Sequence, residues 1–146
     1  AELGIAADAT FHLGIGDGAV SKHEQGLQDW LQQPLQPGDL VLAPWRFDGH
    51  PDHEAAGRAA CRAARAVGCR RLEYPVWGWH WLDPACAHMA WEFPQLVDIS
   101  AVASVKRSAI ARFRTQTGNV PGLNSPPVLP SHVLARFFRD YEVFLA

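Results

Sequence analysis

The chain has 146 residues, of which 48% are hydrophobic, and its formal net charge is -2. This hydrophobic content excludes a disordered chain and suffices for one folded domain, residues 1–146, with a core of its own. The small net charge argues against nucleic acid or an anionic membrane as a partner, and no apolar run approaches the ~20 residues of a membrane span. The three cysteines, Cys61, Cys69 and Cys86, lack the paired spacing of a metal site, so we expect free thiols and a cytoplasmic location.

The first part of the chain carries signals for a strand, a helix and a second strand. We expect the end of a helix and then a short strand over residues 11–14, followed by a glycine-punctuated loop. Apolar residues at helical spacing predict a helix over residues 22–33 that ends before Pro34. Residues 40–44 form a continuous apolar run, which predicts a strand buried on both faces, as in a parallel sheet covered by helices.

An alanine-rich stretch after this strand predicts a long helix over residues 53–67. Gly68 is well placed to end it in the left-handed conformation, and the arginines along it are expected to form a solvated face. Residues 71–76 predict the next strand. A strand, a helix and a strand at this spacing form a βαβ unit with a right-handed crossover, which places the chain in the α/β class.

The second half of the chain alternates irregular segments with short periodic ones. Trp77, Trp79 and Trp81 alternate along the chain, and an extended backbone would place all three on one face. Further along we predict a strand over residues 96–99, a helix over 101–116, a loop over 117–130, a short helix over 130–138 and a last strand over 142–145.

Residues 47–57, Phe-Asp-Gly-His-Pro-Asp-His-Glu-Ala-Ala-Gly, follow the strand at 40–44 directly. Ligands of open α/β sheets collect outside the carboxyl ends of the strands, where His50, Asp52 and His53 are expected. We predict that Asp52 is the N-cap of the following helix and that His53 lies in its first turn, where the helix dipole favours a neutral imidazole able to bind a metal. Spacing alone leaves an ordinary capped loop open, because a catalytic zinc usually needs three protein ligands.

The segment 47–53 closely resembles the Gly-His-Pro-Asp-His motif of the PIG-L/LmbE family of zinc-dependent N-deacetylases. The likeness extends to Leu-Gly-Ile-Gly-Asp-Gly at 13–18, Tyr-Pro-Val-Trp at 74–77, Trp-His-Trp at 79–81, Val-Asp-Ile-Ser at 97–100, Lys-Arg-Ser-Ala-Ile at 106–110, Arg-Thr-Gln at 114–116, Leu-Pro-Ser-His-Val-Leu-Ala-Arg-Phe at 129–137 and Glu-Val-Phe-Leu at 142–145. The chain departs from the family pattern at Phe113, where histidine is usual. The resemblance implies a Rossmann-like parallel sheet flanked by helices.

This resemblance also implies chemical roles. His53 would be a zinc ligand, and His50, as an imidazolium, would stabilise the oxyanion of a tetrahedral intermediate. Asp52 would orient His50 and favour its protonated form. Zinc, or another divalent ion, would polarise an amide carbonyl and activate a water molecule. The substrate would be an N-acetylglucosamine-like amino sugar or glycoconjugate, and the products would be acetate and a free amine.

Four residues are candidates for substrate binding. Asp17 matches the family's Asp-Gly pair, although it also suits a turn before Gly18. Asp48 would line the site or only make a turn. Trp77 and Trp79 would form an aromatic wall for a sugar, against the alternative of a core cluster, whereas His80 is expected to be structural.

The family's second motif, His-Pro-Asp-Asp-Glu, supplies a zinc-binding histidine, a zinc-binding aspartate and the general base. The chain has a His-Pro pair only at His50 and Pro51, so we expect an N-terminally incomplete domain that lacks its first strand or strands and is inactive alone. The other half would come from a longer parent or an associated segment, or two copies would dimerise over the bare edges. The alternative is a non-catalytic carbohydrate-binding or scaffold relative.

Overall fold

The computed structural model describes residues 3–83, 94–118 and 126–146. The chain forms two compact units, one of residues 14–96 with 143–146 and the other of residues 1–13 with 97–142. All the predicted site residues belong to the first unit. Within the described ranges, no helix is long and apolar enough to cross a membrane.

The unit of residues 14–96 and 143–146 is built around a strand–helix–strand unit. Its elements are the 3₁₀ helix η2 (Val20–His23), α1 (Glu24–Gln32), β1 (Leu40–Pro44), α2 (Pro51–Val67), β2 (Arg70–Tyr74) and α3 (Gly78–Trp81). The strand predicted at 40–44 is confirmed with the same bounds, and the predicted helices at 22–33 and 53–67 correspond to α1 and α2. Gly68 ends α2 with φ 85° and donates its N–H to the Ala64 carbonyl, as expected.

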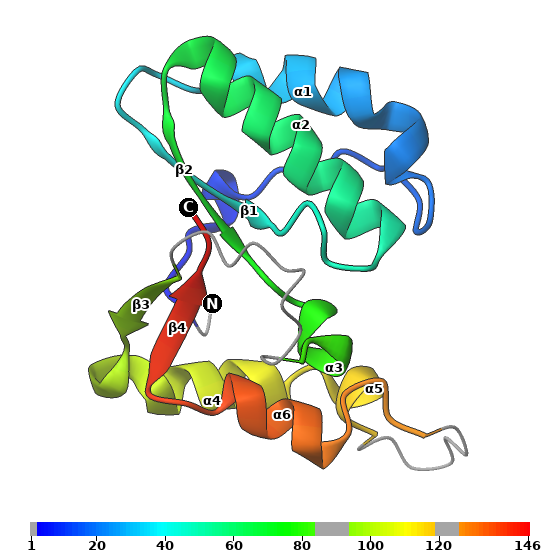
Figure 1. Ribbon diagram of the computed structural model, residues 1–146, viewed down its shortest axis with the longest axis vertical. Coiled ribbons are helices and arrows are strands. Elements are labelled where there is room, and N and C mark those ends of the chain that lie inside the picture. The colour runs from blue at the N-terminus through cyan, green and yellow to red at the C-terminus, as the bar shows by residue number, and fades with distance from the viewer. Residues whose placement is uncertain (1–2, 84–93, 119–125) are drawn as a thin grey trace. The chain divides into compact units, whose positions relative to one another are not determined.

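Strands β1 and β2 pair in parallel, in the register Leu40 with Arg70 to Pro44 with Tyr74. This confirms the parallel pairing expected of a βαβ unit. On the far side of β2, Glu73 and Leu145 exchange two backbone hydrogen bonds of 2.8 Å in an antiparallel bridge. Figure 1 shows α2 lying along the strand pair, with α1 beside α2. The chain is therefore a mixed α/β protein with a small parallel two-stranded sheet flanked by helices.

Helix α2 packs closely because its inner face is made of small residues. Its buried alanines are Ala55, Ala59, Ala60, Ala63 and Ala64. At Gly57 the helix comes so near the end of β1 that an added Cβ would lie 2.4 Å from the Pro44 carbonyl oxygen. A larger residue at position 57 would therefore push the start of α2 away from β1.

Two predictions about strands are wrong. The side chains of Leu40 and Leu42 are 48% and 52% exposed, so β1 is not buried on both faces. The reason is that α2 covers only one face of the pair, and Leu40 and Leu42 point to the other. Residues 11–14 form no strand; the nearest regular element is the 3₁₀ helix η1 (Ala7–Ala9), and the glycines that follow keep the segment irregular.

The unit of residues 1–13 and 97–142 contains η3 (Ser100–Val102), α4 (Ala103–Ala111), α5 (Arg114–Thr117) and α6 (Ser131–Phe137). The helix predicted over 101–116 is interrupted at Phe113, whose ψ of 59° is not helical. β3 (Gln95–Asp98) and β4 (Tyr141–Phe144), whose residues are divided between the two units, form a second two-stranded sheet, which agrees with the strands predicted at 96–99 and 142–145. Lys106 bonds Glu142 at 2.6 Å in this unit. The predicted loop at 117–130 lies partly outside the described residues, and Cys86 lies wholly outside them. Cys61 and Cys69 are free thiols, as expected.

Candidate active site at the start of helix α2

The loop between β1 and α2 places a carboxylate at the centre of the candidate site. Asp48 is fully buried, with 0% of its surface exposed. Its Oδ1 accepts hydrogen bonds from the backbone N–H groups of Val76 and Gly78, both at 2.8 Å, and its Oδ2 accepts one from Trp77 at 2.7 Å. Three fixed donors in a row hold this carboxylate in one orientation, because leaving any of them without an acceptor in the interior would be costly.

His53 is bonded to the same carboxylate. Its Nδ1 lies 2.5 Å from Oδ2 of Asp48, and its side chain is 29% exposed. His53 is in the first turn of α2, as predicted. A histidine whose Nδ1 is bonded to a carboxylate keeps Nε2 for a ligand, which is the usual arrangement of metal-binding histidines in proteins.

His50, and not Asp52, is the N-cap of α2. The backbone N–H of Asp52 donates to Nδ1 of His50 at 3.3 Å, so the prediction that Asp52 caps the helix is wrong. Pro51 takes the first helical position, which suits its fixed φ and places the cap at His50, two residues before Asp52. An Nδ1 that accepts this bond carries no proton, so His50 as an imidazolium would have to give up its capping bond.

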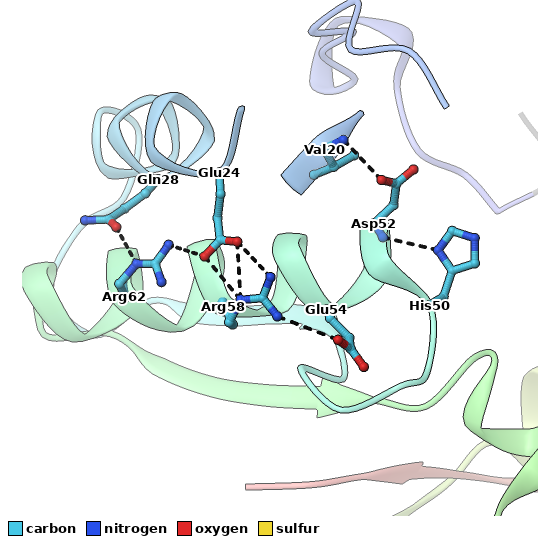
Figure 2. A network of polar contacts seen from close by, with 8 residues as sticks. All are labelled: Val20, Glu24, Gln28, His50, Asp52, Glu54, Arg58 and Arg62. Atoms are coloured by element: carbon cyan, nitrogen blue, oxygen red, sulfur yellow. Dashed lines mark hydrogen bonds and ion pairs between the residues drawn. The ribbon is translucent and has the colours of Figure 1, made fainter. Parts of the chain in front are cut away.

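The carboxylate of Asp52 reaches a distant segment instead. Its Oδ2 accepts the backbone N–H of Gly18 at 2.6 Å and its Oδ1 accepts that of Val20 at 3.1 Å. In Figure 2 this carboxylate points toward Val20, while the backbone nitrogen of Asp52 faces the His50 ring. These bonds hold the loop that contains the exposed Asp17 against the start of α2.

Four rings form a row beside these carboxylates. His50 and His53 stack with ring centroids 4.4 Å apart, Trp77 meets His50 edge-on at 6.1 Å, and His80 stacks on Trp77 at 4.2 Å. The row joins the start of α2 to α3, two segments that are more than 20 residues apart in the chain. Trp77 thus lies beside His50.

The three tryptophans do not lie on one extended strand. Gly78–Trp81 is the helix α3, because Asp48 takes up the consecutive N–H groups of Val76, Trp77 and Gly78 and so turns the chain. In a helix, residues two apart point roughly 200° away from each other. Trp79 therefore points to a different side from Trp77. Trp81 stacks on Trp45 at 6.2 Å and donates Nε1–H to the Asp48 carbonyl at 2.9 Å.

Two residues near Asp48, namely Tyr74 and Gly78, were not among the predicted site residues. Burial raises the pKa of Tyr74, and the negative charge of Asp48 raises it further. Gly78 lies so close that an added Cβ would be 3.1 Å from Oδ1 of Asp48. The effect of Asp48 on Tyr74 and the close approach of Gly78 to Asp48 join positions 26 and 30 residues apart, and no local spacing reveals such relations.

The described residues contain no complete metal site. Within residues 3–83, 94–118 and 126–146, no group of three or more His, Cys, Asp or Glu side chains is arranged to hold a metal ion. His53 with Asp48 behind it fits one ligand of such a site, and a catalytic zinc would need further ligands from elsewhere.

Comparisons of the chain with protein-family models, with curated proteins and with solved structures gave no match.

Proposed function

We propose that this chain carries half of the active site of a zinc-dependent N-deacetylase that acts on an N-acetylated amino sugar. The observation that carries the proposal is the Asp48–His53 pair: a histidine at a helix start, bonded through Nδ1 to a buried carboxylate. His53 is the last residue of the Gly-His-Pro-Asp-His segment, and Asp48 directly precedes that segment. The finer fold that we propose is Rossmann-like, with the β1–α2–β2 unit as part of a larger parallel sheet.

In this proposal His53 is the metal ligand of the chain and binds through Nε2. Zinc bound there would polarise the amide carbonyl of the substrate. The remaining ligands and the general base belong to polypeptide outside the described residues, since these offer no complete set. This chain would therefore bind the metal and position the substrate, but it would not carry out the complete reaction by itself.

His50 is the group that faces the reacting carbonyl in this proposal. It stacks on His53, so a substrate held by the metal would lie within its reach. A protonated His50 would stabilise an oxyanion, and this requires release of the Nδ1 bond from the Asp52 N–H. Trp77, edge-on to His50, would border the sugar, and Asp17 would contact it from the loop that Asp52 holds.

Zinc binding and acetate release by the full gene product test this function. We expect His53→Ala to remove both zinc and activity. We expect His50→Ala to keep the zinc and to lower kcat by on the order of 10²–10³-fold, as for loss of an oxyanion stabiliser. Metal analysis after dialysis against a weak chelator, together with an acetate assay on N-acetylglucosamine oligomers, measures both quantities.

Unchanged zinc content in the His53→Ala variant would refute the ligand assignment. Binding of the sugar oligomers without zinc and without acetate release would instead identify a non-catalytic carbohydrate-binding protein.

A further inference from the structure

We propose that Asp48 is a positioning residue that holds His53 in the tautomer with its proton on Nδ1 and so reserves Nε2 for the ligand. The identity of that ligand as zinc rests on the proposed function, whereas the tautomer does not. The sequence suggested only that Asp48 would line the site or make a turn. Its burial and its four bonds instead indicate that it acts through His53.

The direction of the bond between the two side chains follows from the other partners of Asp48. Both of its oxygens already accept backbone N–H groups, two on Oδ1 and one on Oδ2. The carboxylate is therefore an acceptor at both oxygens, and the Nδ1 atom 2.5 Å away is the donor. A neutral imidazole that donates from Nδ1 has its lone pair on Nε2, which is the atom that a metal binds.

The carboxylate cannot rotate freely to release this bond. A rotation would withdraw acceptors from the N–H groups of three consecutive residues, Val76 to Gly78, in a buried environment. The backbone of Gly78 lies close to the Oδ1 side of the carboxylate, since a Cβ added to Gly78 would lie 3.1 Å from that oxygen. The position of His53 thus depends on the turn that leads into α3, although the two are separated by more than 20 residues.

The variant Asp48→Asn separates this role from simple packing. An amide has one accepting oxygen. Placed where Oδ1 stands, that oxygen keeps the bonds from Val76 and Gly78, and the NH₂ group then faces Trp77 and His53. The opposite orientation would set the NH₂ group against two backbone donors, so the first is favoured. Its NH₂ would donate to Nδ1 of His53 and reverse the tautomer.

A long-range ¹H–¹⁵N correlation spectrum of the metal-free chain measures the tautomer directly. It would be recorded at about pH 8, above the ordinary histidine pKa of ~6.5, and the His53 signals assigned by their loss in His53→Gln. We expect a protonated Nδ1 and an unprotonated Nε2 in the wild-type chain, and the reverse in Asp48→Asn. The matched control is Glu54→Gln. The Glu54 carboxylate lies next to His53 in the first turn of α2, but it accepts the N–H of Gly49 at 3.1 Å. It should keep the wild-type tautomer.

A titration of the full gene product, wild type and Asp48→Asn, with zinc chloride alone provides the second readout. We expect Asp48→Asn to bind zinc about 10–100-fold more weakly than the wild type, as for loss of a carboxylate behind a metal-binding histidine. A wild-type His53 protonated on Nε2 would overturn the inference, whatever the variants do and even if Asp48→Asn does not fold. An unchanged tautomer in a folded Asp48→Asn would overturn it as well. A wild type with the Nδ1 proton whose full gene product binds no zinc would leave this inference standing and would contradict the proposed function.

Discussion

Helix α2 is tied to its neighbours in two ways that differ in what they are made of. At its start, the buried carboxylates of Asp48 and Asp52 accept backbone N–H groups from distant loops. Along its body, Arg58 and Arg62 bond Glu24 of α1 at 2.8 and 2.6 Å, with their side chains 39% and 45% exposed. Figure 2 shows the bond between Asp52 and Val20 at the start of the helix and the bonds of Arg58 and Arg62 to Glu24 along its body.

This difference separates the contacts that position the site from those that only support the pair of helices. A buried carboxylate with fixed main-chain donors allows one geometry, and its loss leaves donors unsatisfied in the interior. An ion pair between long, partly exposed side chains can be replaced by water, so its net contribution is small. We therefore expect the effects of substitution to fall from the start of α2 toward its outer face.

The largest effect is expected for Asp48→Ala. It removes the acceptor of three backbone N–H groups, and at ~1–3 kcal/mol for each unsatisfied group we expect the free energy of unfolding to fall by about 3 kcal/mol or more. Urea denaturation followed by circular dichroism measures it. As a control, Asp39→Ala removes an exposed carboxylate that accepts one backbone N–H, from Gln36 at 2.8 Å, and should cost at most ~1 kcal/mol. Equal losses in the two variants would contradict the distinction.

A smaller effect is expected for a methyl group at the inner face of α2. In Gly57→Ala the new Cβ would stand 2.4 Å from the Pro44 carbonyl oxygen, so we expect a destabilisation of about 1–3 kcal/mol from the forced backbone shift. Gly26→Ala in α1 is the matched control, because its Cβ would meet nothing within 4 Å. There the same change should stabilise the protein by about 0.5–1 kcal/mol through helix propensity. Thermal unfolding of both variants measures this: the midpoint temperature should fall in Gly57→Ala and rise in Gly26→Ala. A rise in both variants would contradict the close packing at Gly57.

The smallest effect is expected for the outer ion pairs. A double-mutant cycle with Glu24→Gln and Arg58→Met should give a coupling of about 0.3–1 kcal/mol that weakens with added salt. The hydrogen bond from Arg58 lowers the pKa of Glu24 below its ordinary value of 4.5, against the opposing effect of burial, and Arg62 lowers it further. A carboxyl group with a lowered pKa stabilises the folded state above its unfolded pKa and loses this contribution as the pH falls through its folded pKa.

The stability difference between the wild type and Glu24→Gln should therefore be constant near neutral pH and shrink below about pH 4.5. Denaturation midpoints of both proteins from neutral pH to about pH 3 measure this difference. A coupling free energy as large as the loss of stability in Asp48→Ala would remove the contrast between the start of α2 and its outer face.

Local patterns in the sequence were sufficient for the main elements of the first unit. The apolar run at 40–44 gave the bounds of β1, and the alanine-rich stretch with Gly68 gave the extent of α2, because strand runs and helix ends depend on neighbouring residues. The same patterns placed His50, Asp52 and His53 together at the start of α2. The cap was misassigned because the helix already starts at Pro51, so that His50, two residues before Asp52, takes this role.

The tertiary structure alone decided the partners of these side chains. Asp48 meets the N–H groups of Val76, Trp77 and Gly78 only because β1 and β2 pair in parallel and end together, and the same contact turns the tryptophan segment into α3 instead of a strand. Likewise, one face of β1 is exposed because α2 covers only the other. Composition and spacing describe what a segment can become, whereas hydrogen bonds between segments some 30 residues apart depend on how the chain brings buried donors and acceptors together.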